Sequence, residues 1–486
     1  MKVVHLNTHD VLGGAARSAW RLHEGLRRIG VDSRMLVRTK HGTSETVQSV
    51  DDGTMAAWHE KIATPWLQRR LPPDSPWFTV GCMDRDISAH PWVREADVIH
   101  LHWVAEWLSA TAIAQLAALR KPLVWTFHDL WPVTCGNHFA GNNTPVDEQW
   151  QTGESLPEPL NAIGRREFER KLLMLAGQPV QVIVPSKWTG EMAKRSRIGG
   201  HWPVHQVTNS IETDIFSPSN MQAARERWQL PQDKVLLLFG CASIMERRKG
   251  FHKLVEALQL ASPPADRAEL VLFGADRPDI TKIALQVHHV GSVGDDKAMA
   301  ALFASADAYL CPTLEDTVPN TVIESLCCGT PVIGFATGGV PDFVTDGRNG
   351  LLAPCGDVPA LATCINRFLL DGAFRDELRG GALATDKSHF APEAQAAQIR
   401  DIYHTCVAQS HPMTLPAVAW DSPSNAMVPS EMSWLVQAAA EAVLRAGQQE
   451  RVLREKLAVA RAKLDKVRTS EQPRQIRSKP WWKFGA

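Results

Sequence analysis

Apolar and polar residues follow two regular spacings along this chain. Short unbroken apolar runs, typical of strands in a sheet covered on both faces, alternate with segments whose apolar residues recur every three or four positions, as in helices. The runs in roughly the first 200 residues are KVVHLN (2–7), SRMLV (33–37), VIHLHW (98–103), PLVWTFHD (122–129) and VQVIVPS (180–186). After the first run, one face of a helix is marked by Ala19, Leu22, His23, Leu26 and Ile29. This alternation predicts a parallel, doubly wound α/β sheet.

The same pattern restarts near Lys234. The new apolar runs are KVLLLFG (234–240), AELVLFG (268–274), AYLCP (308–312) and TPVIGF (330–335), with helical segments such as FHKLVEALQL (251–260) between them. We therefore predict two Rossmann-like α/β units joined around Trp202–Pro218, with a helix from Ala394 to Ala408 closing the second. The predicted divisions are 1–205 for the first domain, 206–390 for the second, 391–408 for the closing helix and 409–486 for a helical tail.

The tail has its own composition. Residues 409–430 are rich in proline and serine and resemble a linker. An apolar seam of alternating three- and four-residue steps then runs from Val436 to Val467, interrupted only by Glu450, and predicts a coiled-coil or docking helix over residues 431–468, a candidate contact for homo-oligomers. From Arg451 onward, 11 Lys/Arg stand against 3 Asp/Glu, and the end reads RSKPWWKFGA. Such a segment suits an anionic membrane surface, while a solvated tail or a helix packed on the protein stays an equal alternative.

Composition narrows the class of protein. Apolar content of 44% and charged content of 22% are ordinary for a soluble enzyme, and a net charge of −1 argues against a general nucleic-acid binder. No apolar run approaches the roughly 18–20 residues that span a bilayer, and the first residues resemble a strand rather than a signal peptide. Nine cysteines without a C-x-x-C pair indicate reduced thiols, no disulfide framework and no zinc site. We expect a cytoplasmic protein, with peripheral contact to the inner face of the plasma membrane if the tail binds it.

The stretch LEDTVPNTVIESLCCGTPVIGF, residues 314–335, carries the most chemistry. Pro319 fixes φ and Asn320 is a good cap, so a helix is predicted from Thr321. A helix start attracts phosphate through its free N–H groups. Glu324, one turn in, and Asp316, on the preceding loop, are placed to accept hydrogen bonds from hydroxyls on either side of that phosphate, as in a sugar nucleotide. In the alternative interpretation, Glu324 only favours the helix dipole and Asp316 only caps a turn.

Three basic residues, Arg247, Arg248 and Lys249, follow the first strand of the second unit. At a strand end facing the same crevice they can neutralise a diphosphate leaving group; elsewhere such a triplet is usually a solvated face.

In the first unit, Gly13 and Gly14 lie between a strand and a helix, where glycine allows close approach of backbone to ligand or simply a tight turn. They do not form the dinucleotide fingerprint G-x-G-x-x-G. His128 ends the strand PLVWTFHD, at the edge where doubly wound folds bind ligands.

These segments resemble a known family. EDTVPNTVIESLCCGTPVIGFATGGVPDFVTDGRNGLL (315–352) is similar to the signature of the family-four (group 1) retaining glycosyltransferases, which have the two-domain GT-B fold. The segments RKGF (248–251), VTNSIETDIFSP (207–218) and GGAARSAWRLHEGLRRIG (13–30) match others of the family in order, so that the resemblance covers roughly residues 1–405. TFHDLWPVTCGNHFA (126–140) looks most like a bacterial branch that builds capsular, exopolysaccharide or O-antigen chains.

The resemblance implies roles for the residues above. On the second domain, Glu324 would bind the ribose hydroxyls, Asp316 would contact the donor hexose, and Arg248 with Lys249 would hold the diphosphate. Main-chain groups around Pro319, Asn320 and Thr321 would contact phosphate or sugar. On the first domain, Gly13 and Gly14 would approach the diphosphate and His128 would face the donor sugar near its anomeric carbon.

Two positions depart from the family pattern. Asp316 is one methylene shorter than the usual glutamate and has Glu315 beside it as a rival. Cys241 stands where an arginine usually follows the strand glycine, so that Arg247 or Arg248 must replace it.

The resemblance implies retaining transfer of a hexose from a nucleoside-diphosphate sugar, by front-face substitution without a metal or other cofactor. We expect a lipid-linked oligosaccharide or another glycan as the acceptor. The rivals are a non-catalytic assembly protein of the polysaccharide machinery and another sugar-nucleotide enzyme, such as an epimerase or phosphorylase, on the same fold.

Overall fold

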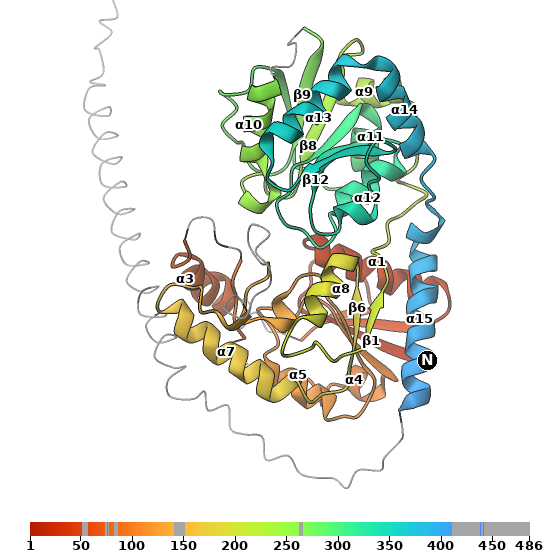
Figure 1. Cartoon of the computed structure of the whole chain (residues 1–486). Helices are drawn as coiled ribbons and strands as arrows, with labels where there is room; N and C mark the ends of the chain where they lie inside the picture. Colours follow the sequence, from red (N-terminus) through yellow and green to blue (C-terminus); the bar gives the residue numbers. More distant parts are fainter. Residues whose placement is uncertain are drawn as a thin grey trace, which may run out of the picture.

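The chain folds into two α/β lobes, each built on its own parallel sheet (Figure 1). The computed structural model describes residues 1–50, 57–72, 75, 77–81, 86–139, 151–261, 266–410, 438 and 441. The predicted fold class, two doubly wound Rossmann-like domains, is confirmed.

Within the described residues, the first sheet has seven strands in the order β3-β2-β1-β4-β5-β6-β7. They are β1 (Lys2–His9), β2 (Asp32–Thr39), β3 (Val47–Ser49), β4 (Val98–Leu101), β5 (Leu123–Thr126), β6 (Val180–Val184) and β7 (Val204–Gln206). All five strands predicted from apolar runs are present. The two edge strands, β3 and β7, have three residues each and are partly polar. They were not predicted because neither contains an apolar run.

Helices cover both faces of this sheet. They are α1 (Gly14–Arg28), the π-helical turn η1 (His59–Ala63), α3 (Thr64–Gln68), α4 (Pro91–Glu95), α5 (Ala110–Ala117), the 3-10 turn η2 (Trp131–Val133), α7 (Leu160–Leu175) and α8 (Lys187–Lys194). Helix α1 buries Ala19, Leu22, His23 and Leu26, the face that its periodicity predicted. Ile29 lies just past its end as the C-cap.

The second sheet, in the part of the chain that the structure describes, has six parallel strands in the order β10-β9-β8-β11-β12-β13. They are β8 (Val235–Gly240), β9 (Ala268–Phe273), β10 (Gln286–Gly291), β11 (Ala308–Cys311), β12 (Val332–Ala336) and β13 (Gly350–Pro354). Around them lie α9 (Met221–Trp228), η3 (Arg247–Lys249), α10 (Phe251–Ala261), α11 (Asp296–Ser305), α12 (Asn320–Cys327), η4 (Val340–Asp342), α13 (Val358–Leu370), α14 (Gly372–Leu383) and η5 (Ser388–Phe390). Only the edge strands β10 and β13 were not predicted.

The last described helix, α15 (Pro392–Gln409), does not close the second domain as predicted. It returns to the first domain and packs along α1 (Figure 1). Its buried Ala396, Ile399 and Tyr403 share one apolar cluster with Leu22 and Leu26 of α1. The prediction was wrong because an apolar stripe indicates that a helix packs against the protein but does not indicate which domain it packs against. This return links the two lobes a second time.

The predicted linker, coiled-coil helix and basic aromatic end lie outside the described residues, apart from two positions. Ala438 is 1% exposed within the core cluster of the first domain, and Glu441 Oε1 lies 2.6 Å from Arg70 Nη2 at the end of α3. These two contacts favour, at that point of the segment, the interpretation that it packs on the protein. Among the described residues, no helix is both long and apolar enough to cross a membrane.

We expect Gly250→Ala to destabilise the second domain more than a matched glycine substitution. Gly250 ends η3 with φ +77°, and a Cβ there would lie 1.8 Å from the carbonyl oxygen of Pro312. The left-handed backbone costs about 1–2 kcal/mol for alanine, and the clash adds about 1–3 kcal/mol. Gly356, with φ +76° and nothing within 4 Å of its Cβ, is the control. Thermal midpoints should fall in the order wild type, Gly356→Ala, Gly250→Ala; equal midpoints for the two variants would contradict the clash.

Candidate active site

A cavity of about 690 Å³ lies where the two domains face each other. Its walls come from the start of α1 and the end of β5 on one side, and from η3, the end of β11 and the start of α12 on the other. This placement follows from the parallel sheets, whose carboxyl ends open toward the same crevice. The cavity is lined by every predicted site residue: Gly13, Gly14, His128, Arg248, Lys249, Asp316, Pro319, Asn320, Thr321 and Glu324.

The start of α12 faces this cavity, and no side chain among the described residues caps it. The helix begins at Asn320, with Pro319 as N-cap, one residue earlier than predicted. Asn320 was therefore wrongly predicted as the cap: its amide instead accepts a hydrogen bond from Asn209 Nδ2 (3.0 Å) and donates one to Ser18 Oγ (3.3 Å). The side chain is drawn to these partners across the domain boundary. The first turn thus keeps its positive end directed at the cavity.

Asp316 forms the electrostatic centre of the second-domain wall. Its Oδ2 lies 2.5 Å from Lys249 Nζ and 3.0 Å from Arg248 Nη1, and the residue is 6% exposed. Burial alone would raise the pKa of Asp316, but Lys249 and Arg248 lower it below its ordinary value. The carboxylate is therefore ionised and shares its charge with two cations. Sequence reasoning placed the three residues together but treated their roles separately and missed this pairing.

Of the two candidate arginines, Arg248 lines the cavity. Its guanidinium donates to the carbonyl oxygen of Glu315 at 3.2 Å and lies 4.2 Å from the ring centroid of Phe139. The contact with Phe139 connects η3, which carries the three basic residues, to the first domain. Glu315, the rival of Asp316, is buried and contributes nothing to the cavity wall.

Glu324 has a partner that the sequence did not reveal. Both terminal nitrogens of Arg21, on α1, lie 3.3 Å from Glu324 Oε1, and Arg21 Nη2 also lies 3.1 Å from Asp296 Oδ2. Burial raises the pKa of Glu324, while Arg21 opposes that shift. Glu324 Oε2 has no hydrogen bond to a described residue. The periodicity of α1 predicted only its apolar face. Arg21 lies outside that face and is buried because the second domain covers it.

His128 joins the two domains through its backbone and reaches the cavity from the first. Its carbonyl oxygen accepts a hydrogen bond from Thr317 Oγ1 at 2.9 Å. Its Nε2 lies 3.1 Å from His102 Nδ1. Burial lowers the pKa of His128 to about 4, so the ring is neutral near pH 7 and suits hydrogen bonding rather than charge stabilisation.

A second polar group lies beside His128, and the sequence placed Asp129 at the same strand end without revealing its hydrogen bonds. Asp129 Oδ2 lies 2.6 Å from His138 Nδ1 and accepts from Trp103 Nε1 at 2.7 Å, while His138 Nε2 lies 2.8 Å from Thr79 Oγ1. Trp103, Asp129 and His138 all line the cavity. Although burial opposes it, His138 lowers the pKa of Asp129. With these hydrogen bonds already made, Asp129 orients its neighbours and is poorly placed to act as a base.

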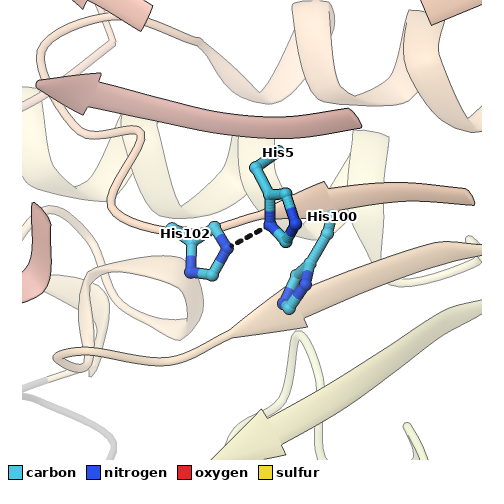
Figure 2. Close-up of side chains that lie close together, drawn as sticks. All are labelled: His5, His100 and His102. Atoms are coloured by element: carbon cyan, nitrogen blue, oxygen red, sulfur yellow. Dashed lines mark hydrogen bonds between the residues drawn. The ribbon is translucent and has the colours of Figure 1, made fainter. Parts of the chain in front are cut away.

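In the first domain, one ring nitrogen from each of His5, His100 and His102 lies within 4.8 Å of the other two (Figure 2). They form the one group of at least three histidine, cysteine or acidic residues with metal-ligand spacing that the described part of the chain contains. All three rings are buried in the first domain.

Family models match both halves of the chain. Residues 12–215 match the model of glycosyltransferase family 4, and residues 234–371 match that of the group 1 glycosyl transferases. A D-inositol 3-phosphate glycosyltransferase of Xylanimonas cellulosilytica is 28% identical over 80% of this chain and 91% of its own length.

Solved structures share the fold. Sucrose-phosphate synthase from Thermosynechococcus elongatus superposes with a TM-score of 0.57 and 21% identity over 84% of this chain and all of the other. HepE of Anabaena, determined in complex with UDP-glucose, does so with a TM-score of 0.54 and 18% identity over 83% of this chain and all of HepE. Because the family models, the relatives and the two-lobed fold agree, the chain belongs to the family-four, group 1 glycosyltransferases with the GT-B fold.

Proposed function

We propose that this glycosyltransferase moves a hexose from a nucleoside-diphosphate sugar to an acceptor hydroxyl with retention of anomeric configuration. The observation that carries the proposal is the convergence, in one cavity between the domains, of an uncapped helix start, two cations and two buried carboxylates. Fixed positive charge and N–H donors suit a diphosphate, and the carboxylates on either side suit hydroxyls.

The donor is expected to lie mainly on the second domain. Glu324, with Oε2 unoccupied by described residues, would accept from the ribose hydroxyls. Lys249 and Arg248 would turn from Asp316 toward the diphosphate, and Asp316 would then accept from hydroxyls of the hexose. The diphosphate then pairs with the two cations, and the hexose hydroxyls supply the hydrogen bonds that the buried carboxylate of Asp316 needs. HepE, which has the same fold, holds UDP-glucose, which supports a nucleotide-sugar donor here.

The proposed chemistry is a front-face substitution. The bond between the anomeric carbon and the β-phosphate oxygen breaks, and the acceptor oxygen forms its bond on the same face of the sugar. The acceptor proton passes to the departing phosphate oxygen. Lys249, Arg248 and the start of α12 stabilise the charge that develops on the leaving group, so no metal is needed in this scheme. Asp316, whose oxygens would accept hydrogen bonds from the hexose hydroxyls in this arrangement, is a weak candidate for a covalent nucleophile.

The proposed acceptor is a growing, lipid-linked surface polysaccharide of a bacterium, bound from the first domain at the cytoplasmic face of the membrane. Trp77, Trp103 and Phe139 line that side of the cavity, and Trp77 is 46% exposed. Flat aromatic faces of this kind suit a sugar ring, with apolar body and polar edge. The inositol phosphate named by the relatives is the competing acceptor, and it would place a second phosphate near the basic residues.

A donor and acceptor panel tests the proposal. Thermal shift should first identify the nucleotide sugar that raises the melting midpoint, and proton NMR of the product should then show the anomeric configuration of the donor. An inverted product would reject the retaining mechanism. Binding of nucleotide sugars with neither transfer nor hydrolysis across the panel would reject the enzyme assignment and favour an assembly role.

A further inference from the structure

Three histidines form a hydrogen-bonded file that leads from the core of the first domain to the cavity. His5 on β1 places Nδ1 2.9 Å from His102 Nε2 (Figure 2). His102, just past the end of β4, places its other nitrogen, Nδ1, 3.1 Å from His128 Nε2. His128 lines the cavity. The three rings are thus connected in series, with a buried end at His5 and an accessible end at His128.

Each ring in the file is neutral near pH 7. Burial lowers the pKa values of His5 and His102 well below their ordinary range, with nearby histidines adding to the effect, and lowers that of His128 to about 4. A neutral imidazole carries one N–H and one bare nitrogen. Because each link needs one donor and one acceptor, the file has only two complete proton arrangements.

The two ends of the file distinguish these arrangements. Among the described residues, neither buried His5 Nε2 nor His128 Nδ1 has a hydrogen-bond partner, and His128 belongs to the cavity wall. If every ring carries its proton on Nε2, an N–H group at His5 is buried and unsatisfied. If every ring carries it on Nδ1, only a lone pair is unsatisfied there. Orphaned buried N–H groups are the rarer of the two in proteins.

We propose that His5 and His102 are positioning residues that hold His128 as the Nδ1–H tautomer, so that it presents a neutral N–H donor to the cavity. This N–H group faces a hydrogen-bond acceptor oxygen of the ligand. That the oxygen belongs to a sugar hydroxyl or a phosphate of the nucleotide sugar rests on the function proposed above. The tautomer itself does not. His128 then acts as a fixed dipole and has no lone pair in the cavity with which to remove a proton.

A metal ion is the rival occupant of the buried histidines. His100 Nδ1 lies 2.5 Å from Tyr403 Oη and His100 Nε2 lies 2.7 Å from Thr126 Oγ1, so both of its nitrogens are committed to hydroxyl groups. Both nitrogens of His102 are committed to the file. An ion would break these bonds inside a buried layer, which makes the hydrogen-bonded file the better account.

His100 also provides the matched control. Its ring centroid lies 4.2 Å from that of His102, yet it makes no hydrogen bond to the file. His100→Phe and His102→Phe therefore remove the same buried chemistry from neighbouring positions, and only the second interrupts the file.

Nitrogen NMR of protein labelled with ¹⁵N-histidine, assigned with a His128→Asn variant, tests the tautomer directly. In the wild type, His128 should be protonated at Nδ1 and bare at Nε2. In His102→Phe the Nε2–H form should appear, and kcat/KM for the donor should fall about two- to tenfold, the range for one lost hydrogen bond. His100→Phe should preserve both the tautomer and kcat/KM.

An Nε2–H tautomer of His128 in the wild type overturns the proposal whether or not any variant folds. So does an equal tautomer change in His100→Phe, or one equivalent of zinc bound by His5, His100 and His102 in metal analysis and X-ray absorption. If the Nδ1–H tautomer depends on His102 but no nucleotide sugar is turned over, the file stands and the proposed function fails.

Discussion

Replacing Lys249 by methionine is expected to lower kcat for sugar transfer by about 100- to 1,000-fold. The ammonium lies in the cavity, 2.5 Å from Asp316 Oδ2, where it can follow the charge that develops on the departing diphosphate. Loss of one donor to a developing negative charge typically costs this much, because methionine cannot stabilise that charge in its place. Initial rates at saturating donor and acceptor measure the effect.

Lys253→Met is the matched control for that experiment. Lys253 lies on α10, four residues further along the chain, and its partner is Glu256, with Nζ and Oε2 3.1 Å apart. It carries the same charge on the same domain but does not line the cavity. We expect its kcat to stay within twofold of the wild type. A Lys249→Met enzyme with unchanged kcat, or a Lys253→Met enzyme with an equal loss, would rule out leaving-group stabilisation by Lys249.

The sequence predicted the central strands because strands that are buried on both faces consist almost entirely of apolar residues. A strand such as β8 is covered on both faces and must be apolar throughout, so VLLLFG identifies it. Edge strands escape this rule: β10, with the sequence QVHHVG, is partly exposed along most of its length. An edge strand forms because it pairs with a neighbouring strand, and the pattern of its own residues does not show that pairing.

The sequence also predicted that the site residues lie together, because their order relative to the strands determines at which edge of each sheet they lie. His128 follows β5, Lys249 follows β8 and Asp316 follows β11, and the carboxyl ends of parallel strands in two facing sheets open on one crevice. What sequence order does not capture is pairing across that crevice. The contact of Arg21 with Glu324 exists only when the domains face each other, and nothing in the segment around Arg21 specifies its partner. The same is true of α15, whose apolar face fits α1 of the other domain.

Glu324→Ala is expected to weaken nucleotide binding by about 10- to 100-fold. A charge-assisted hydrogen bond from a ribose hydroxyl to a buried carboxylate contributes about 1.5–3 kcal/mol, and Glu324 Oε2 remains available to accept it while Oε1 holds Arg21. The variant should also lose stability, since a buried guanidinium that loses one partner keeps its desolvation cost. Isothermal calorimetry with the nucleoside diphosphate measures affinity, and thermal unfolding measures stability.

Separating these two effects requires a variant that disturbs Arg21 without touching the ribose site. Asp296→Ala meets that need: its Oδ2 lies 3.1 Å from Arg21 Nη2, and the residue does not line the cavity. Both variants should lower the melting midpoint, because each strips a carboxylate from the same guanidinium. Only Glu324→Ala should weaken the nucleotide, since Asp296 has no ligand to hold. Equal dissociation constants for the two variants would mean that Glu324 serves to anchor Arg21 and the domain interface, and its assignment to the ribose would have to be abandoned.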